Sequence, residues 1–385
     1  MLRMAVGHSD ELDPADAAAE VVAACRASLD GLEPAGAILF ASFDSFSPAL
    51  VAGIRGGFPD TPLLGSTSAA EMSSVGGYRE DSVVLAALAS DRIDMAVGVA
   101  DGLDGDVEIA VGSAVRQALD GSDREPRLCI VLADFFAADG QRMLDAVADS
   151  LPPGVVVVGG VSAREDFRLQ PPSYQVANDR IVADGIAVMV LCGEFAFSTG
   201  VRTGLRPLGG QGTVTRSEFG QLLEIDGRPA REFTSRYLDV TGPATFGNPL
   251  AVFEPGAEDF YLRAIQAADE PGALSVPGLV PLGSRVQLTT SPTEDLLAGA
   301  TSSLDAAAAT FPGGATVEAA LIFSCAVRRF LLGTKTRREA EIAQLALGAD
   351  LPLAGVYCFG EVGPIAGTPT SRYLNDTFVT LLLGT

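Results

Sequence analysis

The sequence predicts an α/β protein with two domains, built from related βαβ-type units whose mixed sheets are largely buried. Three observations lead to this fold class. A pattern of strand, loop, helix and glycine-terminated strand occurs three times, each time over roughly 30 residues, the length of one βαβ unit. The strands are almost continuous apolar runs, which is typical of sheets covered on both faces. The 385 residues are 48% hydrophobic, which is enough for two domains with sizeable cores.

The first copy begins with a predicted strand over residues 37–40. A helix follows, with Ser47 as its N-cap and Pro48 at its first position. TPLLGSTSAAEM then supplies the glycine-terminated strand and a polar loop that reaches Glu71, and a closing strand is predicted over residues 82–88.

The second copy has the same order of elements. We predict a strand over residues 128–132, a helix after Asp139, and a strand over residues 155–158 that ends in Gly159-Gly160. The apolar run over residues 186–193 is the closing strand.

The middle of the chain has a different pattern, with short strands and many turn residues. Strands are predicted over residues 213–215 and 221–225, followed by a helix over residues 229–238 and a meander over residues 248–290. A capping box formed by Ser291 and Glu294 then opens a helix that ends near residue 309. We place the domain boundary near residue 222, which gives domains over residues 1–222 and 223–385.

The third copy follows this helix. We predict a strand over residues 320–323, a helix whose capping box is Thr336 and Glu339, and the glycine-terminated strand in PLAGVYCFGEVGP, which reaches Glu361. The segment RYLNDTFVTLLL contains the closing strand.

The polar loops after the three glycine-terminated strands are the predicted location of a binding site. In open α/β sheets, ligands bind beyond the carboxyl ends of the strands. Glycine lets a ligand or a neighbouring backbone approach closely. We therefore expect the three strand ends to face a shared cleft, and the alternative is that these glycines serve only tight turns and close packing.

The net charge of −23 argues against two classes of partner. Such a surface repels phosphate backbones and anionic membranes, so we expect no nucleic acid and no membrane as a partner. No apolar run approaches the roughly 18–20 residues that span a bilayer. Because the N-terminus also lacks the long apolar region of a signal peptide, the sequence predicts a cytoplasmic protein.

Cysteine and histidine usage limits the metal and redox chemistry. The five cysteines form no CxxC pair, so neither a disulfide framework nor a zinc ribbon is indicated. His8 is the only histidine, which removes most His-based metal sites and the Ser-His-Asp triad. We expect no metal and no cofactor, with haem binding through His8 as an alternative.

Four segments of the chain carry a resemblance to a known family: VTRSEFGQLLEIDGRPA, LIFSCAVRR, LPLAGVYCFGEVGP and LNDTF. They are similar to the signatures of FIST proteins, which combine a FIST N domain with a FIST C domain, and the resemblance covers about residues 30–380. It implies a sensory protein that binds a small, amino-acid-like ligand and acts in signal transduction through a separate signalling partner. Some relatives are regarded as haem-dependent gas sensors, which keeps the haem alternative open.

The resemblance also implies positions for functional residues. The family's motif residues fall on Ser324, Cys325, Arg328 or Arg329, Gly360, Glu361, Asn375 and Thr377. Where the family often has His just before the late Asn, this chain has Arg372, Tyr373 and Leu374.

The residues themselves suggest how a small ligand would be held. Arg328 and Arg329 belong to a basic cluster in an acidic protein, which indicates either an anion site or an exposed patch paired with surface acids. Glu361, with Asn375, would hold a donor-bearing group such as an ammonium, and Glu71 occupies a similar place in the first copy; the alternative for both glutamates is an ion pair or bonds to loop N–H groups. Neutral hydrogen bonds are expected from four further residues: Ser66, Thr67, Ser68 and Ser162.

An enzyme on the same scaffold is the second hypothesis. Cys325 and Cys358 both lie at predicted strand ends, where either thiol would work with Glu361. The alternative is that both cysteines are buried packing residues. We favour a ligand-binding sensor over an enzyme because no histidine nearby in the sequence offers to activate either thiol.

Overall fold

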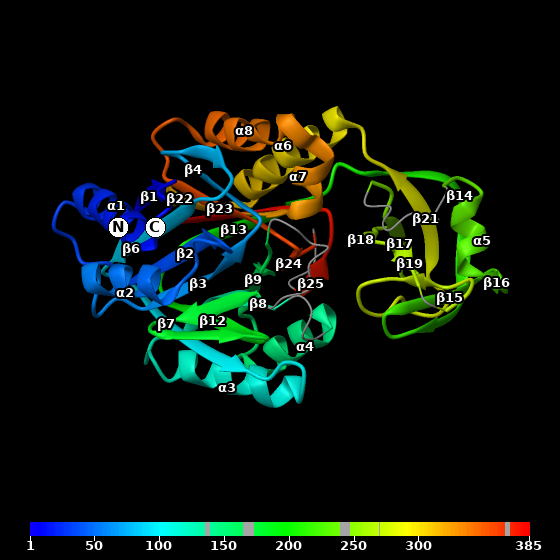
Figure 1. Ribbon diagram of the computed structural model, residues 1–385, viewed down its shortest axis with the longest axis horizontal. Helices are drawn as coiled ribbons and strands as arrows, with labels where there is room; N and C mark the ends of the chain where they lie inside the picture. The colour runs from blue at the N-terminus through cyan, green and yellow to red at the C-terminus, as the bar shows by residue number, and fades with distance from the viewer. Residues whose placement is uncertain (135–138, 165–172, 239–246, 269, 366–369) are drawn as a thin grey trace.

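The computed structural model describes residues 1–385 except for residues 135–138, 165–172, 239–246, 269 and 366–369. A larger body contains three six-stranded sheets with helices on its outside, and a smaller β unit stands at one end (Figure 1). The predicted class, α/β with mixed and largely buried sheets, is confirmed.

The body consists of three units with the same order of elements. The first unit contains β1 (Leu2–Ser9), α1 (Pro14–Leu29), β2 (Gly36–Ser42), α2 (Pro48–Gly57), β3 (Leu63–Ser68) and β6 (Val83–Ser90). The second contains β7 (Ile93–Asp101), α3 (Val107–Leu119), β8 (Pro126–Ala133), α4 (Gly140–Ser150), β9 (Val156–Val161) and β12 (Gly185–Gly193). The third contains β13 (Ala196–Arg202), α6 (Thr293–Thr310), β22 (Val317–Cys325), α7 (Ala326–Leu332), a 3-10 turn (Gly333–Lys335), α8 (Arg337–Leu347), β23 (Leu353–Cys358) and β26 (Phe378–Gly384).

The strand pairing explains why the sheets are mixed. In each unit the two central strands are parallel: β2 with β3, β8 with β9, and β22 with β23. The closing strand of each unit, β6, β12 or β26, runs antiparallel between the first central strand and the opening strand. Each unit is therefore a βαβ crossover extended by an antiparallel pair.

Each unit gives a β-hairpin to the sheet of another unit. The three hairpins are β4 (Ala70–Ser73) with β5 (Gly77–Arg79), β10 (Tyr174–Ala177) with β11 (Arg180–Ala183), and β24 (Gly360–Pro364) with β25 (Ser371–Leu374). β4 of the first unit pairs with β23 of the third, β24 of the third with β9 of the second, and β10 of the second with β3 of the first. This cyclic hairpin exchange completes all three sheets.

The core lies where the inner faces of the three sheets meet. Buried apolar residues from all three units form one cluster there, and the rings of Phe40 and Phe323 meet edge to face with centroids 6.1 Å apart. The outer faces are covered by helices, α1 and α2 on the first sheet, α3 and α4 on the second, and α6 and α8 on the third (Figure 1). Burial on both faces explains why the strands are almost continuously apolar.

A small β unit is inserted in the third unit between β13 and α6. Its elements are β14 (Arg206–Glu218), β15 (Gln221–Ile225), β16 (Arg228–Pro229), α5 (Ala230–Ser235), β17 (Leu250–Phe253), β18 (Tyr261–Arg263), β19 (Gln266–Ala267), β20 (Leu274–Ser275) and β21 (Arg285–Thr290). An apolar cluster that joins Phe253 and Leu262 to Leu296 and Leu332 attaches it to the body. Residue 222, near which we predicted the domain boundary, lies in β15 within this unit.

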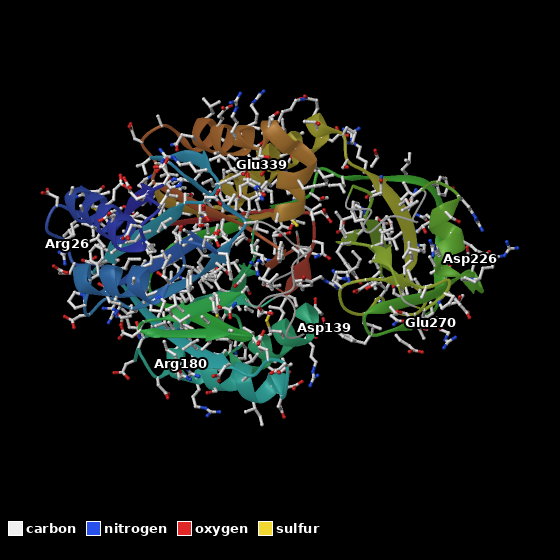
Figure 2. The ribbon with its side chains drawn as sticks, in the orientation of Figure 1. Arg26, Asp139, Arg180, Asp226, Glu270 and Glu339 are labelled. Carbon is white, nitrogen blue, oxygen red and sulfur yellow. The ribbon has the colours of Figure 1, made fainter. Side chains whose placement is uncertain are left out.

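Two of the predicted helix starts are confirmed. The Ser47 hydroxyl accepts a hydrogen bond from the Leu50 N–H, and the Asp139 carboxylate accepts one from the Gln141 N–H. The body and the small unit approach each other at this second helix: a Cβ added to Gly278 would lie 3.2 Å from Asp139 Oδ1, and Figure 2 shows Asp139 on the side of the body that faces the small unit.

Both predicted capping boxes are wrong. Thr336 already has helical backbone angles, and its hydroxyl donates to the carbonyls of Arg329 and Gly333 because the 3-10 turn leads directly into α8. The Ser291 hydroxyl donates to the Gly247 carbonyl, and Pro292 takes the N-cap position of α6 without a side-chain cap.

Candidate functional site

The three glycine-terminated strands do converge. Three backbone hydrogen bonds link their ends in a ring: Ala69 N–H to the Tyr357 carbonyl (2.9 Å), Ala163 N–H to the Thr67 carbonyl (3.1 Å), and Phe359 N–H to the Val161 carbonyl (3.1 Å). Each bond joins one unit to the next, so the ring is the point from which the three hairpins depart.

The repeated glycine serves close packing. A Cβ added to Gly65 would lie 2.8 Å from the Leu39 carbonyl oxygen, and one added to Gly355 would lie 3.0 Å from the Ile322 carbonyl oxygen. At Gly159 the corresponding distance, to the Val131 carbonyl oxygen, is 2.0 Å. In every copy the glycine therefore lets the parallel neighbour strand approach, which is the alternative that the sequence left open.

In two of the copies, the glutamate six residues after the glycine accepts hydrogen bonds from side chains at the end of the strand. Glu71 accepts hydrogen bonds from the hydroxyls of Ser68 and Ser82. Glu361 accepts one from the Cys358 thiol (3.6 Å), and its second oxygen accepts from Thr377. The sequence carries Glu165 at the same offset in the second copy, and that residue lies outside the described residues.

The strand end of the first unit is a closed polar network. His8 Nδ1 lies 2.8 Å from Ser73 Oγ, and His8 Nε2 lies 2.9 Å from Ser82 Oγ. Burial lowers the pKa of His8 to about 4. Because both ring nitrogens are engaged by serines, binding of haem iron through His8 would require one of these bonds to break.

The predicted neutral ligand contacts are buried in the body. Ser162 accepts a hydrogen bond from the Gln175 amide (2.9 Å), and Thr67 Oγ1 accepts one from the Tyr174 N–H (3.2 Å). Ser66 and Ser68 are buried as well. These side chains hydrogen-bond to, or pack against, other residues of the body. They are not among the residues that line the groove described below.

The prediction that Arg328 holds a ligand anion conflicts with its surroundings. Its side chain is fully buried, and its guanidinium donates two hydrogen bonds to Glu339, at 2.9 and 2.7 Å. It also donates to the carbonyls of Thr203 and Leu296, while Ser324 and Tyr357 donate to the other oxygen of Glu339. Figure 2 marks Glu339 within this part of the third unit.

Arg329 is also engaged within the protein. Its guanidinium lies 2.9 Å from the Glu80 carboxylate, and it donates a hydrogen bond to the Tyr78 hydroxyl at 3.0 Å. The pair is partly exposed. Both arginines that the sequence singled out therefore have an acidic partner within the protein.

An aspartate in the left-handed conformation precedes the closing strand of every unit. The φ angles are 50° at Asp81, 50° at Asp184 and 57° at Asp376. Asp81 and Asp184 are exposed, whereas Asp376 is 1% exposed. Thr203, on the link to the small unit, lies against it and donates a hydrogen bond to its carbonyl.

Asp376 and Asn375 have buried oxygens without partners. Among the residues that the structure describes, no group hydrogen-bonds to either carboxylate oxygen of Asp376 or to the side-chain oxygen of Asn375. Burial raises the pKa of Asp376 to about 7 and that of Glu361 to about 8, although the hydrogen bonds from Thr377 act in the opposite direction on Glu361. The strand end of the third unit thus holds two acids that are hard to ionise.

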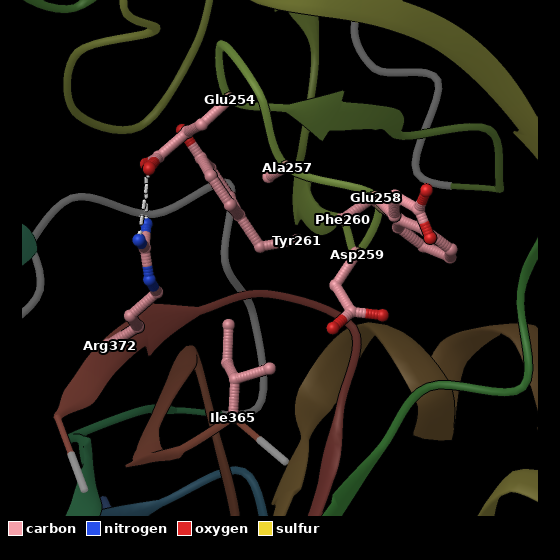
Figure 3. A pocket seen from close by; sticks show the side chains of 8 residues that line it. All are labelled: Glu254, Ala257, Glu258, Asp259, Phe260, Tyr261, Ile365 and Arg372. Carbon is pink, nitrogen blue, oxygen red and sulfur yellow. Dashed lines mark hydrogen bonds and ion pairs between the residues drawn. The ribbon is translucent and has the colours of Figure 1, made fainter. Parts of the chain in front are cut away.

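A groove runs between the small unit and the strand end of the third unit. Its volume is about 360 Å³. The lining residues are Val201, Arg202, Thr203, Asp259, Phe260, Tyr261, Leu262, Ile365, Leu374 and Thr377. A second hollow of about 210 Å³ shares Asp259, Phe260, Tyr261 and Ile365 with it, and there Arg372 forms an ion pair with Glu254 (Figure 3).

The groove carries both signs of charge. Arg202 donates a hydrogen bond to the Val201 carbonyl (2.7 Å) and has no ion-pair partner in the described part of the chain. Asp259, in the loop between β17 and β18, is exposed and likewise forms no ion pair with a described residue. Figure 3 shows its carboxylate on the side of this loop that faces Ile365. Thr377 lines the opposite wall and donates its hydroxyl hydrogen to Glu361 (2.7 Å).

Sequence reasoning named Glu361, Asn375 and Thr377 but missed Arg202, Asp259 and Asp376. The aspartate had a signal, because Asp81, Asp184 and Asp376 recur just before the closing strand of each copy. Arg202 and Asp259 had no such signal in the sequence, because the groove forms where the small unit meets a segment far away in the sequence.

The described residues contain no group of three or more His, Cys, Asp and Glu side chains that could hold a metal ion. In the same residues, every helix is too short or too polar to cross a membrane.

We expect all five cysteines to be unreactive in the native protein. All are buried, and burial raises the pKa of Cys325 and of Cys358 well above that of an ordinary thiol. Ellman's reagent is therefore expected to label none of them until the protein is unfolded in guanidinium chloride, which serves as the control. A thiol that reacts quickly in the native state would contradict this and favour the enzyme hypothesis.

Comparison with known proteins gives two family matches along the chain. Residues 36–228 match the FIST N domain, and residues 230–364 match the FIST C domain. An uncharacterised protein of Mycobacterium tuberculosis strain CDC 1551 is 28% identical over 394 residues, covering 95% of this chain and 96% of that protein. An uncharacterised protein of Mycobacterium bovis is 27% identical over 263 residues, covering 64% of this chain and 65% of that protein.

The solved structures that resemble this one are distant. A cyanuric acid hydrolase from A. caulinodans is 12% identical, with a TM-score of 0.39 and coverage of 99% of each chain. PurLQS from Thermotoga maritima is 12% identical, with a TM-score of 0.25 and coverage of 100% of this chain and 72% of that chain. Similarity at this level supports no statement about the activity of this chain.

Proposed function

Because the chain belongs to the FIST family, with a FIST N domain followed by a FIST C domain, we propose that it is a sensory protein that binds a small ligand in the groove beside the small unit. The ligand is a zwitterion with an apolar side chain, such as an aliphatic amino acid. The protein acts in the cytoplasm through a separate signalling partner, as the family resemblance implies.

One observation carries this proposal: the groove places acceptor groups and an arginine that forms no ion pair with a described residue around the same space. Arg202 would hold the ligand carboxylate, and Asp259 with Thr377 would hold its ammonium. Ligand pockets of about 300–1,000 Å³ with mostly apolar walls and a few polar groups are typical of small-molecule sites. The volume of about 360 Å³ lies at the lower end of that range, which suits a single amino acid.

The groove walls indicate the kind of ligand side chain. The apolar lining residues are Val201, Phe260, Leu262, Ile365 and Leu374. Burying an aliphatic side chain against them contributes roughly 25 cal/mol per Å² of apolar surface. This favours leucine-like ligands over strongly polar ones.

Thr377 connects the ligand to Glu361. Its hydroxyl donates to Glu361 Oε2, so the lone pairs of Oγ1 remain to accept a hydrogen bond from a ligand ammonium. Glu361 therefore acts on the ligand through Thr377, and not by the direct contact that the sequence suggested.

The test is isothermal titration calorimetry with L-leucine, isopentylamine and 4-methylpentanoic acid. We expect leucine to bind more tightly than either analogue, because each analogue lacks one of the two charged groups. Arg202→Ala should weaken leucine binding by about 10- to 100-fold, which corresponds to losing a charged hydrogen bond of roughly 1.5–3 kcal/mol.

Arg3→Ala is the matched control, since Arg3 is an exposed arginine on β1. It should leave leucine binding unchanged. If none of the three compounds binds, or if Arg202→Ala and Arg3→Ala behave alike, the proposal fails.

A further inference from the structure

We propose that the binding of a ligand ammonium at Thr377 expels one proton from the buried carboxyl pair formed by Glu361 and Asp376. This inference rests on the proposed function and adds a coupling between ligand binding and protonation. The proton leaves to solvent, and no covalent bond of the ligand changes.

The geometry of the pair is the first reason. Glu361 is 0% exposed and Asp376 is 1% exposed, so neither carboxyl group reaches bulk water. Glu361 receives hydrogen bonds from Thr377 and Cys358, whereas Asp376 receives none from the described residues. A buried carboxylate without donors is strongly disfavoured, so a proton resides on the pair.

The groups around the two carboxyl groups provide no free positive charge that would stabilise their ionised forms. Those that face it are Cys325 on β22, Cys358 on β23, Tyr373 on β25 and Arg328 on α7. Burial raises the pKa values of both thiols and of the Tyr373 phenol, so these three groups stay neutral between pH 6 and pH 8.5. Arg328 is the cation among these four groups, and its guanidinium forms an ion pair with Glu339.

Thr377 brings the ligand close enough to change this balance. Its Oγ1 lies 2.7 Å from Glu361 Oε2. An ammonium nitrogen bonded to Oγ1 at about 2.9 Å lies at most about 5.6 Å from that oxygen. At this distance and an effective dielectric constant near 20, one positive charge weakens proton binding by about a hundredfold.

The sign of the pH dependence follows from the raised pKa values. Glu361 has a pKa of about 8 and Asp376 of about 7, so below pH 7 both carboxyl groups are protonated before the ligand arrives. A hundredfold weaker proton affinity lowers the pKa of Glu361 to about 6 in the complex, so binding expels a proton between about pH 6 and pH 8, and ligand affinity falls by up to tenfold per pH unit as the pH falls through that range. Above pH 8 the pair is increasingly ionised without ligand, and the affinity levels off.

The first measurement needs no ligand. Infrared spectra should show the carbonyl stretch of a protonated, buried carboxyl group at pH 6.5, and this band should disappear as the pH rises towards 9. Glu361→Gln and Asp376→Asn should each reduce the band. Glu71→Gln is the matched control, because Glu71 is equally buried at the equivalent place in the first unit but lies away from the groove. The change that Glu71→Gln causes in the carbonyl band between pH 6.5 and pH 9 should differ from the change that Glu361→Gln causes.

The second measurement is calorimetry with L-leucine at pH 7 in buffers of different ionisation enthalpy, which reports the number of protons released. We expect about one proton for the wild type and for the control Asp81→Asn, and less than half a proton for Glu361→Gln and Asp376→Asn. Both asparagine substitutions suit the left-handed backbone at these positions. Circular dichroism checks that each variant folds.

The outcomes separate the two proposals. Leucine binding without proton release, or a missing infrared band, overturns this inference and leaves the proposed function intact. If neither leucine nor its analogues bind, both proposals fail, whatever the infrared spectra show.

Discussion

Arg328→Met is expected to lower the free energy of unfolding by about 3–5 kcal/mol. The substitution leaves the Glu339 charge buried without its guanidinium partner, because both side chains are 0% exposed. It also leaves the carbonyls of Thr203 and Leu296 without their donor. Urea unfolding followed by circular dichroism measures the effect.

The neighbouring residue provides the control. Arg329→Met breaks a partly exposed ion pair with Glu80 and should cost less than about 1 kcal/mol. Adding Glu339→Leu to Arg328→Met should recover part of the lost stability, because replacing both partners of a buried ion pair removes the unpaired charge. Equal effects of Arg328→Met and Arg329→Met would contradict this account of the buried pair.

Gly159→Ala is expected to destabilise the protein by more than about 3 kcal/mol, through strain and a steric clash together. The φ angle of Gly159 is +145°, and the new Cβ would lie 2.0 Å from the Val131 carbonyl oxygen of the adjacent parallel strand. β8 and β9 would have to separate, which disrupts the sheet of the second unit. The yield of folded protein and the urea midpoint report the loss.

Gly31→Ala is the matched variant, because Gly31 also has a positive φ but no neighbouring atom within 4 Å of the added Cβ. It should cost about 1–2 kcal/mol from backbone strain alone. If both glycine variants lose the same stability, the close approach of the two strands at Gly159 is not what requires a glycine.

Local sequence patterns predicted most elements of the body. The strand over residues 186–193 corresponds to β12, and the helix begun by Ser47 and Pro48 is α2. These predictions succeed because apolar periodicity and N-cap chemistry are local. The capping boxes at Thr336 and Ser291 were wrong because their side chains bond to groups that the sequence spacing does not reveal.

The candidate site could be predicted from the sequence less completely than the fold. The prediction that Glu361 and Asn375 contact a ligand stays a prediction, and the structure places the Glu361 carboxylate against Thr377. Arg328 looked like an anion site because its charge was visible, but its partner Glu339 is eleven residues away on another helix. Which charges neutralise one another depends on tertiary packing, and so does the lack of an ion pair between Arg202 and any described residue.

The cyclic hairpin exchange makes the sheet of each unit depend on a hairpin from another unit. A unit that lost its hairpin would leave the edge of a neighbour's sheet without a hydrogen-bonded partner strand. No unit can therefore complete its own sheet without a neighbour. The insertion between β13 and α6 lies outside this exchange, and it supplies one wall of the groove.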